Sequence, residues 1–498
     1  MISAAATRST DSEACSLLID GRSVAGEGEV IAVENPATEE IFVRFPGASP
    51  AQFDAAIGAA RRAFDSGVWS LKPPGERAAV ARRLLDRLLA QRAMLQDVIV
   101  RETGCPAGSP VMFAQLDSPL KATRDLVDLY LTLPEVEDSG QPFSERINPA
   151  GALVLSVRRH APIGVVAAIS AYNFPLFLNL WKIVPALLVG DTVVLRPSPL
   201  TPLSALALAD AAREAGIPDG VLNIVAEAGS EGAVLLTTDP RVDMVTFTGS
   251  NEVGARVMAQ AAGTLKRVQL ELGGKSAQIY LPDSVERAAS AAASVCLAHA
   301  GQGCVLGTRV LVPEADKARV MEAMAASLRG VVIGDPQDPR TQMGPVISAA
   351  QRARCETYVR LATEAGAKVV LGGARPAHLS RGYFFEPTIL DLPDNKNPAA
   401  QDEIFGPVVG VIGYRSLDHA VEMANDTVFG LSGYVFGKDL RQAAEIAQRL
   451  RTGTVNVNSG MMSAYVSSGG WGRSGQGRER GIEGLRFYQQ LQILNLAN

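Results

Sequence analysis

The chain has 498 residues, of which 47% are hydrophobic and 20% are charged, and its net charge is −5. This length predicts two or three domains, and the absence of basic clusters argues against a nucleic-acid partner. The five cysteines are scattered without CxxC spacing, which argues against a disulfide framework or a metal site. We therefore expect a globular cytoplasmic enzyme that holds no metal.

The N-terminal segment and one apolar segment bear on targeting. Residues 1–15 lack the apolar core of a signal peptide, and we expect them to form a flexible tail. Residues 163–190 are apolar enough to suggest a membrane span, but they include Lys182, two asparagines and two prolines. Because a spanning helix would bury these groups at high cost, we expect a buried strand, turn and helix and no membrane association.

Between residues 163 and 274, short β-rich segments alternate with helical segments. The predicted strands cover 163–170, 191–197, 220–226, 243–249 and 267–273, and the predicted helices cover 175–190, 202–216, 231–239 and 252–263. Strands joined by helices of this length form right-handed βαβ units and an open parallel sheet. Ligands of such sheets bind at the carboxyl ends of the strands.

A second α/β unit follows. It begins with a strand at 276–281, a helix from about 284 to 300 and a strand at 308–313. Asp283 and Glu286 have the spacing of a capping box for this helix, and Gly301 is a natural stop. The further predicted strands cover 367–373, 384–392, 405–414, 432–437 and 453–458, among helices at 315–328, 417–424 and 439–450.

Cys304 is a candidate nucleophile in the stretch AHAGQGCVLG. Most free cysteines are small buried residues, but glycines at 301, 303 and 307 leave space around the sulfur for a substrate. From these residues alone, a nucleophile and a core thiol are equally favoured. His299 lies five positions earlier across a helix end, which gives no assured contact, so we interpret it as a core or surface histidine.

Three other segments carry groups suited to chemistry. Asn173 follows a predicted strand, where its amide would donate to a developing oxyanion. Glu271 ends another strand in an apolar run, where a raised pKa would suit a general base. Gly249 and Gly254 flank a strand-to-helix turn that would approach a pyrophosphate, although their spacing is not GxGxxG.

The ordered set AYNFP, LRPSP, FTGSNEVG, ELGG, GQGC, EIFGPV and GRSGQGRERG resembles the aldehyde dehydrogenase superfamily, in its NAD(P)-dependent non-acylating type. The resemblance runs from about residue 16 to the end of the chain. It implies that Cys304 attacks the aldehyde carbon, with Asn173 and the Cys304 amide as the oxyanion hole, and that hydride loss leaves a thioester. Glu271 matches the base that activates water for hydrolysis, and Lys182 with Glu479 matches a proposed proton relay.

The resemblance also implies an architecture of a Rossmann-like parallel-sheet cofactor domain, a second α/β catalytic domain and a small β element through which a homodimer or homotetramer forms. The implied ranges are 16–141 and 160–274 for the cofactor domain, 275–470 for the catalytic domain, and 142–159 and 484–498 for the oligomerisation element. The implied cofactor-binding residues are Ser170, Tyr172, Arg196, Ser198, Gly229, Phe247, Gly249, Ser250, Gly254, Leu272, Gly273, Glu403 and Phe405.

Two departures from the family pattern bear on specificity. Arg196 replaces the usual lysine and Pro199 replaces the glutamate that repels a 2′-phosphate, so we expect NAD with NADP also possible. The predicted pocket is roomy and apolar, without an evident cation for a substrate carboxylate, which favours an aromatic, long aliphatic or terpenoid aldehyde over a semialdehyde acid. Its predicted lining residues are Phe174, Leu178, Trp181, Gly303, Val305, Met462 and Ser468. The alternatives are a semialdehyde or CoA-acylating dehydrogenase, or a non-catalytic family member.

Overall fold

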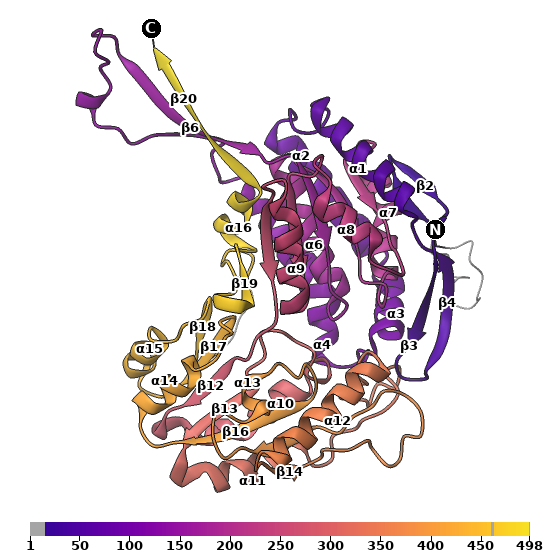
Figure 1. The fold of residues 1–498 in the computed structure, drawn as a ribbon, viewed down its shortest axis with the longest axis vertical. Helices are drawn as coiled ribbons and strands as arrows, with labels where there is room; N and C mark the ends of the chain where they lie inside the picture. Colours follow the sequence, from indigo (N-terminus) through magenta and orange to yellow (C-terminus); the bar gives the residue numbers. More distant parts are fainter. Residues whose placement is uncertain (1–14, 460–462, 498) are drawn as a thin grey trace.

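The computed structural model describes residues 15–459 and 463–497 (Figure 1). The predicted tail therefore lies outside the described residues except for Cys15, whose side chain is buried in the core. Met462, predicted to line the substrate pocket, also lies outside them. Within the described ranges, none of the helices combines the length and apolar character that crossing a membrane requires.

The first large sheet has the predicted parallel centre. Its strand order is β19-β11-β10-β7-β8-β9-β1-β2, and the five central strands run parallel. These strands are β7 (Val165–Ile169), β8 (Thr192–Arg196), β9 (Leu222–Ile224), β10 (Met244–Thr248) and β11 (Arg267–Glu271), with β1 (Leu17–Ile19), β2 (Arg22–Val24) and β19 (Gly475–Gln476) at the edges. The strand order reverses at β7, because β8 lies on one side and β10 on the other, and ligands bind at such a switch point.

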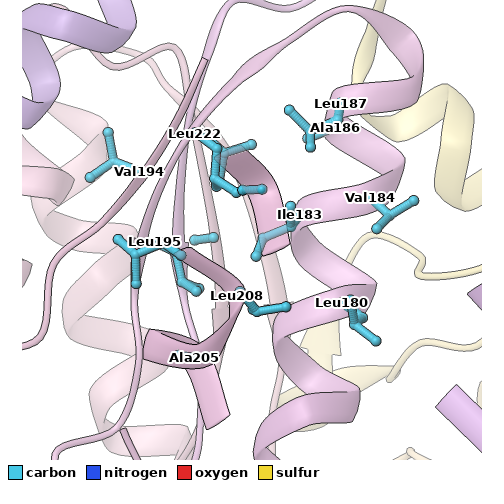
Figure 2. Packing of buried hydrophobic residues seen from close by; sticks show 14 of the residues in the cluster. Leu180, Ile183, Val184, Ala186, Leu187, Val194, Leu195, Ala205, Leu208 and Leu222 are labelled. Carbon is cyan, nitrogen blue, oxygen red and sulfur yellow. The ribbon is translucent and has the colours of Figure 1, made fainter. Parts of the chain in front are cut away.

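The connecting helices cover this sheet. They are α6 (Pro175–Val189), α7 (Leu203–Ala215), α8 (Glu231–Thr238) and α9 (Asn251–Ala262), joined by α1 (Pro50–Asp65), α2 (Pro74–Ala90), α3 (Arg92–Thr103), α4 (Pro110–Met112) and α5 (Ser118–Tyr130). Figure 2 shows apolar side chains of α6 and α7 against β8 and β9, including Ile183, Leu208 and Leu195. The apolar segment 163–190 is thus the predicted strand, turn and helix, and its lysine is buried inside the protein.

The second sheet has the order β14-β15-β16-β13-β12-β17-β18, and only β14 runs antiparallel. Its strands are β12 (Ala277–Tyr280), β13 (Arg309–Pro313), β14 (Lys368–Leu371), β15 (Thr388–Asp391), β16 (Val408–Tyr414), β17 (Ser432–Phe436) and β18 (Thr454–Val457). Its helices are α10 (Ala291–Cys296), α11 (Lys317–Leu328), α12 (Ala349–Glu364), α13 (Pro398–Gln401), α14 (Leu417–Asn425) and α15 (Leu440–Ala447).

The long helix predicted from 284 to 300 is wrong. A 3₁₀ segment covers Pro282–Ser290, α10 ends at Cys296, and a short turn at His299–Gly301 follows. The predicted capping box does not form, because the Asp283 carboxylate instead accepts hydrogen bonds from the backbone of Lys438 and Asp439. Gly301 therefore does not stop a helix, but it still has a positive φ of 74°.

A small third sheet joins distant parts of the chain. Strand β6 (Val154–Pro162) pairs antiparallel with β20 (Gln489–Ala497), and β5 (Val136–Asp138) pairs with the other edge of β6. Figure 1 shows β6 and β20 extending away from the rest of the molecule. Because β5 belongs to this sheet, the sheet begins before residue 142, where the predicted element starts. A two-stranded sheet of β3 (Val30–Asn35) and β4 (Glu40–Pro46) was not predicted.

Candidate active site

One cavity of about 1000 Å³ lies between the two large sheets. It is lined from the first sheet by the segments that follow β7, β10 and β11, and from the second by the Cys304 loop and by Glu403 and Phe405. Cys304 and the two residues predicted at strand ends, Asn173 and Glu271, are therefore brought together across more than a hundred residues of sequence. This is the carboxyl edge of a parallel sheet at its switch point.

Cys304 is the only one of the five cysteines that is partly exposed, and the other four are buried. Its loop is fixed by Gln302, whose buried amide donates to the His299 carbonyl and accepts from the Ile347 N–H at 2.9 Å. A side chain at Gly301 would place its Cβ 2.0 Å from the Gly406 carbonyl oxygen. The partial exposure of the residue and its place on the cavity wall favour the nucleophile over the core thiol.

The Cys304 thiol is protonated at neutral pH in this state. Close packing of protein atoms raises its pKa to about 12, and the nearby carboxyls of Glu403 and Glu271 act in the same direction. The backbone N–H of Cys304 opposes the rise by a hydrogen bond to its own sulfur. A reaction through the thiolate therefore requires a group that removes the proton.

Asn173 points its amide at the Cys304 loop. Its Nδ2 donates to the Gln302 carbonyl oxygen at 3.0 Å, and its own backbone carbonyl accepts from the Gln115 amide at 2.8 Å. A primary amide has two N–H groups, so the bond to Gln302 leaves one of them for another acceptor. The side chain is fixed and lines the same cavity as Cys304, as expected of an oxyanion donor.

Glu271 ends β11 opposite Thr248 of β10, and its side chain lines the cavity. Its Oε1 is buried and has no hydrogen-bond partner within the described chain. Burial raises the pKa of this carboxyl, and the neighbouring Glu479 raises it further, while Lys182 and Arg480 act in the opposite direction. A buried carboxyl with a free oxygen and a raised pKa is suited to accept a proton from water.

Lys182 and Glu479 form a buried ion pair behind the cavity. The lysine Nζ donates to Glu479 Oε1 at 2.9 Å and to Thr246 Oγ1 at 3.0 Å. Lys182 is fully buried, whereas Glu479 reaches the cavity wall. The two predicted relay residues are therefore in contact, and Lys182 is not a surface cation of its helix.

His299 takes no part in this arrangement. Its ring is buried against Phe174, with the ring centroids 5.6 Å apart, and burial lowers its pKa to about 4. The ring is therefore neutral, and it does not line the cavity. This agrees with its interpretation as a core histidine.

The predicted cofactor residues fall into two groups. One group lines the cavity and comprises Tyr172, Gly249, Ser250, Leu272, Gly273, Glu403 and Phe405. Ser250 caps α9 by accepting from the Val253 N–H at 3.4 Å, and Glu403 Oε1 accepts from the Gly274 N–H at 3.0 Å. The Phe405 ring packs edge-on against Tyr172, with centroids 6.0 Å apart.

The second group does not line this cavity and comprises Ser170, Arg196, Ser198, Gly229, Phe247 and Gly254. The Ser170 hydroxyl donates to Asn179 at 2.6 Å inside the core, so its side chain is committed to α6. Arg196 ends β8, where its Nε donates to the buried Glu227 carboxylate at 3.0 Å and its Nη2 donates to the Gly229 carbonyl at 2.7 Å. The positive charge of Arg196 is therefore balanced by Glu227.

The predicted substrate pocket is only partly apolar. Phe174, Leu178, Gly303, Val305 and Ser468 line the cavity as predicted, whereas Trp181 does not and packs against Phe177 with the ring centroids 5.5 Å apart. The expectation that no cation faces this pocket is wrong, because Arg480 lines it. Arg480 was missed because its motif assigned a role only to the neighbouring Glu479, and only the tertiary structure places the guanidinium at the cavity.

Comparisons with known sequences and structures agree with the geometry of this site. Residues 23–494 match the family described as "Aldehyde dehydrogenase family". The chain belongs to the aldehyde dehydrogenase family. It is 35% identical to the putative aldehyde dehydrogenase DhaS of Bacillus subtilis, over 95% of this chain and 94% of that protein. It is 36% identical to betaine aldehyde dehydrogenase 1 of rice, over 93% and 91% of the two chains.

Solved structures of other aldehyde dehydrogenases are similar to this one throughout. Betaine aldehyde dehydrogenase of Staphylococcus aureus in complex with NAD⁺ has a TM-score of 0.92 and 33% identity, covering 98% of this chain and 95% of that one. A mutant aldehyde dehydrogenase C of Pseudomonas syringae, in complex with NAD⁺ and octanal, has a TM-score of 0.89 and 36% identity, covering 96% of both chains. This dehydrogenase thus has the α/β architecture of the family.

Several residues that line the dehydrogenase cavity were not predicted, and two of them are aromatic residues close to the predicted ones or to the Cys304 loop. Phe177 lines it one helical turn from Phe174, and that spacing on one helix face was a signal available in the sequence. Tyr434 also lines it and donates its hydroxyl to the Val305 carbonyl at 3.0 Å. Nothing in the local sequence around β17 distinguished this tyrosine from a core residue.

Proposed function

We propose that the protein oxidises an aldehyde to its carboxylic acid with NAD, through a thioester on Cys304 that water hydrolyses. The observation that carries this proposal is the convergence of Cys304, Asn173 and Glu271 on one cavity wall. A partly exposed thiol, an amide donor and a buried carboxyl are the nucleophile, oxyanion donor and base that acyl chemistry requires.

The residues along the cavity suit NAD. Ser250 stands at the N-terminus of α9, where backbone N–H groups favour a pyrophosphate. Glu403 accepts one backbone hydrogen bond through Oε1, and its Oε2 has no partner among the described residues, so it can accept from a ribose hydroxyl. When bound, NAD accepts the hydride that the aldehyde carbon loses. The NAD-bound dehydrogenases of similar structure support this assignment.

The first half of the reaction uses Cys304 and Asn173. The thiol loses its proton to the Glu271 carboxylate or, when that group is neutral or absent, to solvent, and a bond forms between Sγ and the aldehyde carbon. The aldehyde oxygen becomes an oxyanion, which the free N–H of Asn173 Nδ2 and the Cys304 amide stabilise. When the carbonyl bond re-forms, the hydrogen of the aldehyde carbon leaves as hydride and the acyl group remains on Sγ.

The second half uses Glu271. After its proton has passed to solvent, the carboxylate takes a proton from a water molecule as the water oxygen attacks the thioester carbon. The bond to Sγ then breaks, the carboxylic acid leaves, and Cys304 is regenerated. Retention of this base favours hydrolysis over acyl transfer to CoA, because only hydrolysis needs activated water.

An absorbance assay for NADH over a panel of aldehydes tests the proposal. We expect reduction of NAD and release of free acid without CoA. Release of acid only when CoA is present would indicate the acylating reaction instead. No reduction of NAD or NADP by any aromatic, aliphatic or semialdehyde substrate would contradict the proposal.

The body of the proposed substrate is apolar. Phe174, Phe177 and Leu178 supply an aromatic and aliphatic wall to the cavity, as expected for an aromatic or medium-chain aldehyde. The similar structure that holds octanal supports this class. Betaine aldehyde, suggested by the names of other relatives, is less suited because its ammonium group would face Arg480.

Glu227 is expected to set the preference for NAD over NADP. Its buried carboxylate neutralises Arg196 at the carboxyl end of β8 and also accepts from the backbone N–H groups of Gly232 and Ala233 on α8. These groups would be the donors for a 2′-phosphate at the end of β8, and Glu227 already occupies them. Replacing Glu227 with glutamine should raise the NADP-to-NAD ratio of kcat/KM about 10-fold, because Arg196 then lacks its counter-charge.

Calorimetric titration with each dinucleotide separates this effect from catalysis. The matched control is Glu214→Gln, which removes an exposed carboxylate that pairs with Arg87. We expect Glu227→Gln alone to tighten NADP binding. If NADP affinity changes equally in the two variants, or if the NADP-to-NAD ratio of kcat/KM changes in neither, Glu227 does not select the cofactor.

We further propose that the third sheet joins subunits into a homodimer or homotetramer. Several apolar side chains of β6 and β20 are exposed, including Leu155, Leu491 and Ile493, and exposed apolar strands favour association. Sedimentation equilibrium should give a multiple of the 52.4 kDa chain mass. Ile493→Asp should lower that mass without unfolding the protein, and a monomeric parent protein would contradict the assignment.

A further inference from the structure

Arg480 occupies an unusual position beside the reactive residues. It directly follows Glu479 and precedes α16 (Gly481–Phe487), and its backbone has a φ of 62°, in the left-handed region that non-glycine residues seldom adopt. The first turn of α16 fixes this conformation, because the Arg480 carbonyl accepts from the Gly484 N–H at 2.9 Å. The side chain is thereby directed to the cavity that also holds Cys304 and Glu271.

The Arg480 guanidinium makes few contacts with other protein groups. Its Nε donates to the Ser468 hydroxyl at 3.1 Å, and its central carbon lies 5.7 Å from the centroid of the Trp181 ring. Within the described chain, no carboxylate lies within ion-pair distance of it, and its two terminal nitrogens have no hydrogen-bond partner. Arginine carries five N–H donors, so most of its donor capacity is available.

The neighbouring carboxyl groups of Glu479 and Glu271 do not form an ion pair with Arg480. Glu479 is engaged by Lys182, and the raised pKa of Glu271 favours its neutral form. Burial lowers the pKa of Arg480, while the two carboxyls oppose that change. The guanidinium nevertheless stays charged at neutral pH, and a partly buried cation without a counter-ion is unfavourable. A ligand with an anionic group would remove this cost.

We propose that Arg480 binds a carboxylate carried by the aldehyde substrate at the end remote from its reacting carbon. This proposal rests on the proposed oxidation of an aldehyde and names the substrate as an aldehyde acid with an apolar body. The planar guanidinium matches a carboxylate in a paired hydrogen-bond geometry. Phe174, Phe177 and Leu178 line the same cavity and would contact the apolar body of such a substrate.

A positioning role is the alternative explanation. Arg480 lies close enough to Glu271 and Cys304 for its charge to affect both of their ionisations. If that were its function, its loss would change the turnover of every aldehyde by a similar factor and would shift the pH profile. A role in substrate binding instead predicts an effect that depends on the charge of the substrate.

Three aldehydes of one shape separate the two roles. They are 4-carboxybenzaldehyde, 4-methylbenzaldehyde and 4-(trimethylammonio)benzaldehyde. We expect the parent enzyme to prefer the carboxy compound, and Arg480→Met to lower its kcat/KM about 10- to 100-fold, mainly through KM. In the same variant, kcat/KM for the methyl compound should change little, and kcat/KM for the cationic compound should rise. Arg480→Lys should recover part of the preference for the carboxy compound, because lysine keeps the positive charge but not the planar pair of N–H donors.

The control variant is Arg451→Met, which removes the same charge and a similar volume from an exposed surface position. It should keep the parent preference. Equal losses for all three aldehydes in Arg480→Met, or a parent enzyme that does not favour the carboxy compound, would overturn the proposal. Calorimetric binding of terephthalate against 4-methylbenzoate gives a readout without turnover. Tighter terephthalate binding that requires Arg480, in a protein that oxidises no aldehyde, would support the anion site while contradicting the proposed function.

Discussion

Cys304→Ala is expected to lower kcat/KM for aldehyde oxidation by about four orders of magnitude or more, because no other side chain on the cavity wall replaces the nucleophile. Cys304 is the cysteine that combines partial exposure with a place on the cavity wall. Binding of NAD should be preserved, since the side chains proposed to hold it lie on other segments. The measurement is steady-state kinetics with calorimetric titration of NAD on the same protein.

The matched control is Cys105→Ala, which removes a buried thiol just after the C-cap of α3. We expect it to retain activity within about threefold, because it lies outside the cavity and costs mainly folding stability. Residual oxidation by Cys304→Ala at the parent rate would show that the thiol is not the nucleophile. Loss of NAD binding in that variant would instead indicate a disrupted fold.

Glu271→Gln is expected to slow steady-state turnover about 10²- to 10⁴-fold, because a general base contributes about that much. The variant is isosteric and keeps one oxygen in the same buried place, so packing of β11 should be unaffected. If thiol activation proceeds without the carboxylate, a first turnover of NADH should precede the slow phase, with the acyl group retained on the protein. A stopped-flow trace distinguishes this burst from uniform slowing of both half-reactions.

The pH dependence of the parent enzyme's activity reports the ionisation of the Glu271 carboxyl. Burial and Glu479 raise the Glu271 pKa, so the protonated form, which cannot accept a proton, persists to higher pH. Activity should therefore still be rising with pH near neutrality, whereas a glutamate with an ordinary pKa of about 4.3 would be ionised below that range. A profile already flat from weakly acidic pH upwards would contradict a raised pKa for the base.

Most of the strands and turns that position this site could be predicted from the sequence. The five β-rich segments between residues 163 and 274 form the five parallel strands of the first sheet, because continuous apolar runs between helices are typical of strands covered on both faces. Cys304, Asn173 and Glu271 were each suggested by their place at a turn or strand end. Their assembly in one cavity was implied by the family resemblance rather than by local pattern.

The features that escaped prediction depend on residues distant in sequence. The helix expected from residue 284 is interrupted, and its intended cap Asp283 accepts instead from the backbone of Lys438 and Asp439. The counter-ion of Arg196 is Glu227, 31 positions away on the next strand's loop. Arg480 was missed for a similar reason, because only tertiary structure places its guanidinium beside Trp181 and the cavity.

In the proposed reaction, Cys304 carries an acyl group that is released by water activated by Glu271. This reaction is tested most directly by peptide-level mass spectrometry of Glu271→Gln, quenched in acid after mixing with an aldehyde and NAD. We expect one acyl group of the substrate's mass on the peptide that contains Cys304, and none when Cys304→Ala is combined with the same substitution. An acyl group on a different residue, or NADH formed through repeated turnovers with Cys304 unmodified throughout, would contradict the proposed reaction.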